Sequence, residues 1–151
     1  MNTGRRHIAA AGLIAITLSG CYLPRWPVDA SLTSGFGLRF IEMRPDIHRG
    51  VDLGVPTGTR VWAMAGGTVR FAGTMSGFGN VVWIDHANGL LSIYAHLSTI
   101  RVEAGTRVRA GDTIGASGES GVVTAPHLHF EVWRWGNPVD PIAVLGGRPP
   151  S

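Results

Sequence analysis

The sequence predicts a turn-rich all-β domain, and three features support that prediction. Of the 151 residues, 22 are Gly and 9 are Pro, which favours short strands joined by turns over a bundle of helices. β-branched and aromatic residues gather in short runs that glycines separate. Between two of these runs lies Asn88-Gly89, a dipeptide typical of the type I′ hairpin turn, in which both central residues need a positive φ.

The expected strands follow one another from residue 59 onward. The clearest runs cover residues 60–63, 68–72, 81–85 and 91–96, and the Asn88-Gly89 turn joins the last two. The tetrapeptide Gly58-Thr-Arg-Val61 recurs as Gly105-Thr-Arg-Val108, which fits a small barrel- or sandwich-like β domain made of two similar halves. We expect the segments 34–39 and 43–48 to be irregular.

Length and charge narrow the class of protein. A chain of 151 residues with 44% hydrophobic residues suffices for one domain with a packed core. All 13 basic residues are Arg, so the lysine that biotin- and lipoate-carrier domains modify is absent. The net charge of +3 falls to about +1 if a leader containing Arg5 and Arg6 is removed, and no basic run with interleaved aromatics occurs. We therefore expect no nucleic-acid partner.

The first twenty residues have the pattern of an export signal. Arg5 and Arg6 precede an apolar run at 8–18, too short to span a bilayer comfortably but long enough for a signal-peptide core. Leu18-Ser-Gly-Cys21 resembles the bacterial lipobox, which implies cleavage before Cys21 and lipidation of that cysteine. An uncleaved anchor, or an ordinary export signal with an incidental cysteine, is the alternative.

These features predict the organisation of the chain. We expect a lipoprotein signal peptide at 1–20, a tether at 21–33, the domain at 34–145 and a loose tail at 146–151. The mature protein would be lipid-anchored in the cell envelope and face the periplasm. Tyr22 in place of Asp after the cysteine favours the outer membrane.

The main functional signal is the stretch 126–132, which reads as a strand. Because side chains alternate along a strand, His127, His129 and Glu131 share one face, and Leu128, Phe130 and Val132 share the other. Two neighbouring neutral imidazoles can serve a divalent metal, one as a ligand and one beside it. Partly exposed sheet residues without a metal are the alternative.

Two further segments offer polar side chains of the same kind. His48 and Asp52 flank Gly50 in what we expect to be a turn entering a short strand, where nitrogen and oxygen ligands suit zinc. A surface ion pair or a turn-capping Asp would explain the same residues. His96 ends an expected strand on the face of Ser92 and Tyr94, and a structural histidine is the alternative there.

Together these residues suggest a zinc hydrolase. Three protein ligands with an open fourth position are typical of catalytic zinc, and the five candidates are His48, Asp52, His96, His127 and His129. Histidines that do not bind the metal could transfer protons or stabilise an oxyanion. The helical His-Glu-x-x-His motif is absent.

The ordered motifs His48-x-x-x-Asp52, Tyr94-x-His96 and His127-x-His129 resemble those of the lysostaphin/LytM-type zinc endopeptidases of the bacterial cell wall. The flanking motifs agree, among them Ser34-Gly-Phe-Gly-Leu-Arg39, Gly50-Val-Asp-Leu53, Ala110-Gly-Asp-Thr-Ile-Gly115 and Asn137-Pro138. The resemblance covers about residues 31–145. It implies a mostly antiparallel β domain with a zinc-containing groove along the sheet.

The resemblance also implies roles for individual residues. His48, Asp52 and His129 would bind Zn²⁺, and His96 and His127 would handle the nucleophilic water and the oxyanion. Apart from the resemblance, we expect Tyr94 to border the substrate groove. Strand alternation points Glu131 to the cleft side, where it would support a histidine from behind or face solvent.

The expected substrate is the peptide stems of peptidoglycan, with the D-Ala to diaminopimelate cross-link as the bond cut by a monomeric enzyme. Some LytM-type lipoproteins have lost zinc ligands and activate cell-wall amidases without cleaving anything themselves. A purely structural envelope module is the third alternative, and it leaves the five converging polar residues unexplained.

Overall fold

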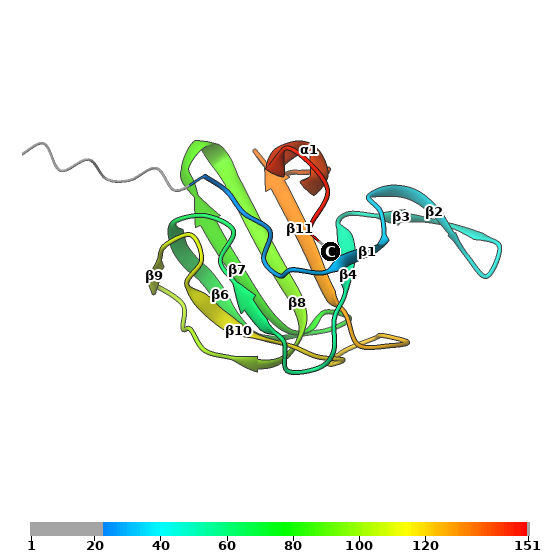
Figure 1. Ribbon diagram of the computed structural model, residues 1–151, viewed down its shortest axis with the longest axis horizontal. Coiled ribbons are helices and arrows are strands. Elements are labelled where there is room, and N and C mark those ends of the chain that lie inside the picture. Colours follow the sequence, from blue (N-terminus) through cyan, green and yellow to red (C-terminus); the bar gives the residue numbers. More distant parts are fainter. Residues whose placement is uncertain (1–22, 151) are drawn as a thin grey trace, which may run out of the picture.

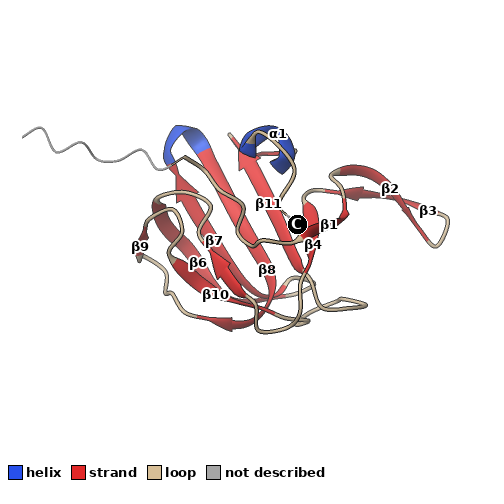
Figure 2. Cartoon of the chain, viewed as in Figure 1, coloured by secondary structure: helices blue, strands red, loops and turns tan. Residues whose placement is uncertain are grey.

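The computed structural model describes residues 23–150 as one β domain in which the strands pair antiparallel, which confirms the predicted fold class (Figure 1). The expected signal peptide and Cys21 lie outside the described residues. The strands are β1 Ser31–Ser34, β2 Gly37–Ile41, β3 Arg44–His48, β4 Val51–Gly54, β5 Arg60–Trp62, β6 Gly67–Met75, β7 Gly79–His86, β8 Leu90–Ile100, β9 Arg107–Val108, β10 Thr113–Ser117, β11 Leu128–Arg134 and β12 Asn137–Val139. The only regular helices among the described residues are a single 3-10 turn, Ala87–Gly89, and α1, Pro141–Leu145 (Figure 2).

The main sheet has the order β1-β4-β11-β8-β7-β6-β9, with β10 joining β8 to β5 and with β12 on β11. The hairpin predicted at Asn88-Gly89 is present, because both residues have positive φ, 59° and 67°, and β7 and β8 pair on either side. No helix in residues 23–150 is long and apolar enough to cross a membrane.

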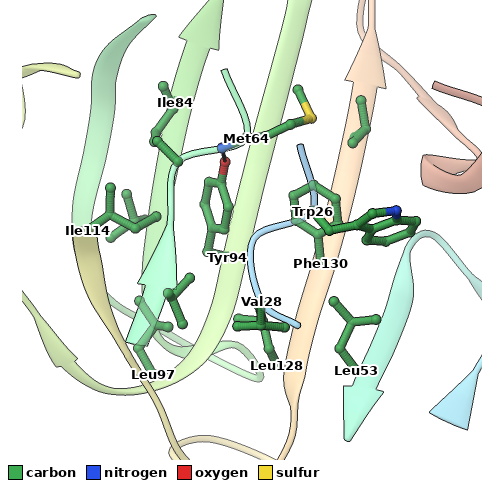
Figure 3. Packing of buried hydrophobic residues seen from close by; sticks show 14 of the residues in the cluster. Trp26, Val28, Leu53, Met64, Ile84, Tyr94, Leu97, Ile114, Leu128 and Phe130 are labelled. Carbon is green, nitrogen blue, oxygen red and sulfur yellow. Dashed lines mark hydrogen bonds between the residues drawn. The ribbon is translucent and has the colours of Figure 1, made fainter. Parts of the chain in front are cut away.

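The central strands bury one face in the main core and leave the other face for the polar site. On the core face, Phe130 of β11 lies directly opposite Tyr94 of β8, with ring centroids 5.3 Å apart (Figure 3). On the opposite face, Ile93 and Ala95 form a smaller apolar cluster beside His129 and Glu131. The alternation predicted for the stretch 127–132 is therefore confirmed.

Tyr94 does not border a groove, and that expectation was wrong. Its side chain is fully buried, and its hydroxyl accepts a hydrogen bond from the backbone N–H of Met64 (2.8 Å) and is hydrogen-bonded to Ser92 Oγ (2.8 Å). Figure 3 shows the ring among the apolar side chains of the core. A phenol can be buried in this way because its polar end finds partners inside the protein.

The segment predicted as a tether is in part a component of the domain. Trp26, Val28 and Ala30 are buried in the main core, and β1 pairs with β4. The Trp26 indole also donates to the carbonyl of Gly147 (3.2 Å), so the start of the expected tail is held as well. Sequence patterning missed this packing because a short extended segment rich in Pro shows no clear periodicity.

The two segments predicted as irregular, 34–39 and 43–48, contribute strands β2 and β3 instead. These form a separate two-stranded hairpin that projects from the body (Figure 1). Its turn is made by Glu42 and Met43, with φ of 48° and 64°. Neither residue is Gly, Asn or Asp, so the usual signal of a tight turn is missing from the sequence.

Candidate metal centre

Three side chains from three strands converge on one point. His48 ends β3, Asp52 lies in β4, and His129 lies directly opposite Asp52 in β11. Asp52 Oδ1 is 2.8 Å from His129 Nδ1 and 3.2 Å from His48 Nε2, and the two nitrogens are 3.1 Å apart. The turn that was expected between His48 and Asp52 is present, since Arg49 and Gly50 form a bend between the two strands.

Hydrogen bonds on the outer side of each imidazole decide which nitrogen faces the centre. His48 Nδ1 lies 2.7 Å from the carbonyl of Gly35, and His129 Nε2 lies 2.9 Å from Glu131 Oε1. Both partners can only accept, so these nitrogens carry the protons and donate. The inner nitrogens, His48 Nε2 and His129 Nδ1, are left with free lone pairs, as metal ligation requires.

Three acceptor atoms at such short distances repel one another unless they share a cation. Two imidazole nitrogens and one carboxylate oxygen are a donor set that suits zinc, and all three lie within 4.8 Å of one another. The residues present therefore fit a zinc ion with three protein ligands.

Without a metal, a proton takes the place of the cation. Burial would lower the pKa of His129, but hydrogen bonds to Asp52 and Glu131 outweigh it and raise the pKa to about 9. Burial would likewise raise the pKa of Asp52, but the interactions of its carboxylate with the His129 and His48 rings hold that pKa well below its usual range. The shifts in the pKa values of His129 and Asp52 show that this arrangement of side chains stabilises a positive charge between them.

Glu131 lies behind His129 and does not face solvent. It is 3% exposed, and its second oxygen accepts a hydrogen bond from Trp133 Nε1 at 2.6 Å. Burial would raise the pKa of Glu131, but the bonds from His129 and Trp133 keep it lower than usual. The buried carboxylate thus fixes the orientation of the His129 ring.

The structure brings His96 and His127 to the same place. Their ring centroids are 4.8 Å apart, and His127 Nε2 lies 3.6 Å from Asp52 Oδ1. His96 Nδ1 donates to the carbonyl of Ser120 (2.8 Å), and His127 Nδ1 donates to that of Ala125 (2.9 Å). Burial lowers the pKa of His96, so this ring is neutral near pH 7.

A β-bulge puts His96 on the groove side of the sheet. Strict alternation would place His96 on the buried face with Tyr94, but the pairing of β7 with β8 shifts register between these positions, and His96 has a φ of 61°. The extra residue turns both Ala95 and His96 to one side, and Leu97 returns to the core. A non-glycine residue with this φ costs on the order of 1 kcal/mol, as is common at functional sites.

The centre lies in an open groove with a volume of about 680 Å³. Ile41 and Arg39 of the hairpin form one wall, and Val122, Val123 and Thr124 belong to the loop that precedes His127. Gly77 and Phe78 from the β6–β7 turn complete the lining beside Asp52, His96, His127 and His129. Four of the five polar residues selected from the sequence therefore line a single groove, and the fifth, His48, is buried directly behind them against Asp52 and His129.

Arg39 was not among the residues for which the sequence predicted a role, although it belongs to a motif that carried the family resemblance. Its guanidinium donates to Asp52 Oδ2 at 3.1 Å, from a strand that the sequence did not predict. The available signal in the sequence was the position of Arg39, which ends the glycine-containing motif 34–39 upstream of His48.

Comparison with known proteins places the chain in a family. Residues 46–141 match the model of Peptidase family M23, and the chain belongs to this family. The match confirms the lysostaphin/LytM-type resemblance that the motifs carried, and the catalytic domain of lysostaphin shares the fold.

Individual relatives agree with the family match. The chain is 43% identical over 119 residues to the DD-carboxypeptidase/endopeptidase Mpg of Neisseria meningitidis serogroup B, covering 78% of this chain and 27% of that protein. It is 39% identical over 121 residues to the peptidoglycan DD-endopeptidase ShyA of Vibrio cholerae, covering 77% of this chain and 28% of that protein. A zinc-containing peptidase from Vibrio cholerae has the same fold, with a TM-score of 0.76 and 31% identity over 86% of this chain and 41% of its own. The chain thus spans about a quarter of the length of these two curated relatives.

The metal assignment makes a direct prediction. Purified wild-type protein should contain close to one zinc per chain, and His48→Ala or His129→Ala should lose most of it, because two ligands rarely hold zinc firmly. Metal analysis after dialysis measures this. His86→Ala, at a histidine outside the groove, is the control and should retain its zinc; full zinc content in both ligand variants would contradict the assignment.

Removing the metal should reveal a pH-dependent stability. In metal-free protein the pKa of His129 is about 9 when folded and about 6.5 when unfolded, so its contribution is complete below pH 6.5 and is lost as the pH rises through 9. The loss is about 3 kcal/mol at most. Urea unfolding of chelator-treated protein at a series of pH values measures it. Asp52→Asn removes one of the two carboxylates that raise this pKa and should make the alkaline loss smaller and shift it to lower pH; a loss unchanged in size and position in that variant would contradict the assignment to the His129–Asp52 pair.

Proposed function

We propose that this protein is a zinc-dependent endopeptidase that hydrolyses the peptide cross-links of peptidoglycan. The observation that carries the proposal is the pair of histidines that the metal does not need. His96 and His127 each hold a proton on Nδ1, which donates to the carbonyl of Ser120 or Ala125. His127 Nε2 lies 3.6 Å from Asp52 Oδ1, and the His96 ring lies beside His127 and His129. A site that only stored zinc would not need two further free imidazoles in the same groove.

The chemistry follows from these groups. A bound zinc ion supplies the Lewis acidity that activates water and polarises a peptide carbonyl. One Nε2 of the His96–His127 pair accepts the proton that the attacking water loses. The imidazolium formed can donate a hydrogen bond to the developing oxyanion and then deliver the proton to the leaving amine as the C–N bond breaks.

The groove suits a peptide with small apolar side chains. Ile41, Phe78, Val122 and Val123 line it, and Arg39 adds a positive charge at one wall. The D-Ala to diaminopimelate cross-link combines a small apolar residue with nearby carboxylates. The names of the Neisseria and Vibrio relatives, a DD-carboxypeptidase/endopeptidase and a peptidoglycan DD-endopeptidase, support the same substrate class. Digestion of purified cross-linked sacculi, with masses measured for the products, identifies the bond cut.

Substitutions of His96 and His127 distinguish an enzyme from an amidase activator. His96→Ala and His127→Ala should each keep the zinc content and lower turnover about a hundredfold or more, the usual range for such groups. The double variant should lose less than the product of the two, because both act on one transition state. Cross-link cleavage by zinc-loaded proteins measures this.

Equal activity in wild type and both variants would remove the pair from the mechanism. Zinc-loaded wild type that cleaves no cross-linked wall, yet stimulates a cell-wall amidase, would assign the protein to the activator class.

The N-terminal sequence extends the proposal to location. We infer that residues 1–20 are a cleaved lipoprotein signal peptide and that lipidated Cys21 tethers a monomeric enzyme in the cell envelope, facing the periplasm and on the outer membrane. The hydrogen bond between Trp26 and Gly147 supports a folded domain that extends at least from the first of these residues to the second.

The lipid anchor has its own test. Wild-type protein should fractionate with membranes, and Cys21→Ser should shift it to the soluble fraction, since several acyl chains bind a bilayer firmly. Mass spectrometry of the mature N-terminus is the matched measurement. An unmodified Cys21 in a cleaved, soluble wild-type protein would contradict the lipobox.

A further inference from the structure

Arg39 connects the hairpin to the metal centre. Its Nε donates to Asp46 Oδ2 at 2.7 Å within the hairpin, and its Nη1 donates to Asp52 Oδ2 and to Ser34 Oγ, both at 3.1 Å. One guanidinium thus links β2, which carries it, to β3, β4 and β1. Its side chain is 31% exposed and lines the groove.

The contact between Arg39 and Asp52 determines which of the two Asp52 oxygens is available to bind the metal. Oδ1 faces His48 and His129, whereas Oδ2 is held by Arg39 on the far side. A carboxylate without this second contact can turn about its last bond and change from one-oxygen to two-oxygen ligation. Groups that hydrogen-bond to a ligand in this way typically affect metal affinity 10- to 100-fold.

The contact with Asp46 holds the Arg39 guanidinium within the hairpin, and the bonds of the same guanidinium to Asp52 and Ser34 join the hairpin wall to the main sheet. The outer side of the hairpin is exposed, with Leu38 at 66%, Phe40 at 68% and Ile47 at 64%, so no core supports it there. The inner side carries the directly paired residues Arg39 and Asp46. Ile41, two residues after Arg39, lines the groove. The hydrogen bonds of Arg39 to Ser34 and Asp52 therefore connect the hairpin, whose outer side is exposed, to the main sheet.

We propose that Arg39 is a positioning residue with two separable actions, one on Asp52 and one on the hairpin wall. The first sets zinc affinity and turnover, and the second sets substrate affinity; this inference rests on the function proposed above. Arginine suits the role because its planar, forked guanidinium reaches two carboxylates at once, whereas the single ammonium of lysine serves one position.

Four variants separate the two actions. Arg39→Gln removes both contacts, Arg39→Lys keeps the charge but not the fork, and Asp46→Asn weakens only the hairpin contact. Arg44→Gln removes a neighbouring exposed arginine on the same hairpin and is the matched control. Circular dichroism and thermal unfolding of each protein confirm that it is folded.

Zinc affinity, measured by competition with a chromogenic chelator, is the first readout and needs no activity. Arg39→Gln should bind zinc about 10- to 100-fold more weakly, and Arg39→Lys should recover part of that loss. Asp46→Asn and Arg44→Gln should stay close to wild type. Arg39→Gln with wild-type zinc affinity, or Asp46→Asn with the same loss as Arg39→Gln, would overturn the proposal.

Kinetics on a soluble cross-linked peptide are the second readout. Asp46→Asn should raise KM severalfold and keep kcat, whereas Arg39→Gln should also lower kcat in the zinc-saturated protein. An unchanged KM in Asp46→Asn would overturn the action on the wall. Inactive wild type would refute the proposed function, and the zinc affinities would still decide the role of Arg39.

Discussion

The central feature of the site is the close approach of three acceptor atoms that repel one another. His48 Nε2, His129 Nδ1 and Asp52 Oδ1 approach within about 3 Å of one another, and only a shared cation makes that arrangement favourable. The fold holds them there through strand pairing, since Asp52 and His129 are direct partners across β4 and β11. The outer hydrogen bonds, to Gly35, Glu131 and Arg39, then fix each ligand in the orientation that directs its free lone pair inward.

The buried face of the sheet supports this polar arrangement. Each core residue in β11 alternates with a residue of the site, so packing of Leu128 and Phe130 fixes where His129 and Glu131 point. Tyr94 packs on Phe130 and is tied to Met64, which fixes β8 just before the bulge at His96. The strain at His96 persists because the strands on both sides of it are paired and buried, as is usual for a strained functional residue.

The amino-acid sequence predicted those parts of the structure that follow local periodicity. Alternation correctly placed His127, His129 and Glu131 on one face, and the Asn88-Gly89 turn was correctly identified. Features set by tertiary contacts were missed: the packing of Trp26 on Phe130, the hairpin turn at Glu42-Met43, and the bulge that separates His96 from Tyr94. A bulge changes the register by one residue without any change in composition, so periodicity could not predict it. The family resemblance, which rests on ordered motifs, identified the convergence of the five polar residues where periodicity alone left alternatives open.

Three histidines line the groove and a fourth, His48, is buried beside them; all four rings are oriented in the same way. Each gives one ring proton to a fixed acceptor, a backbone carbonyl for His48, His96 and His127 and the Glu131 carboxylate for His129. Geometry therefore separates the two candidate metal ligands from the other two histidines: His48 and His129 lie within about 3 Å of Asp52 Oδ1, while His127 lies at 3.6 Å and His96 lies beside His127. A carboxylate behind a ligand makes it more electron-rich than a carbonyl does, which suits His129 for the metal. His96 and His127 have backbone carbonyls as partners instead, which fix the tautomer of each ring and leave its Nε2 without a proton.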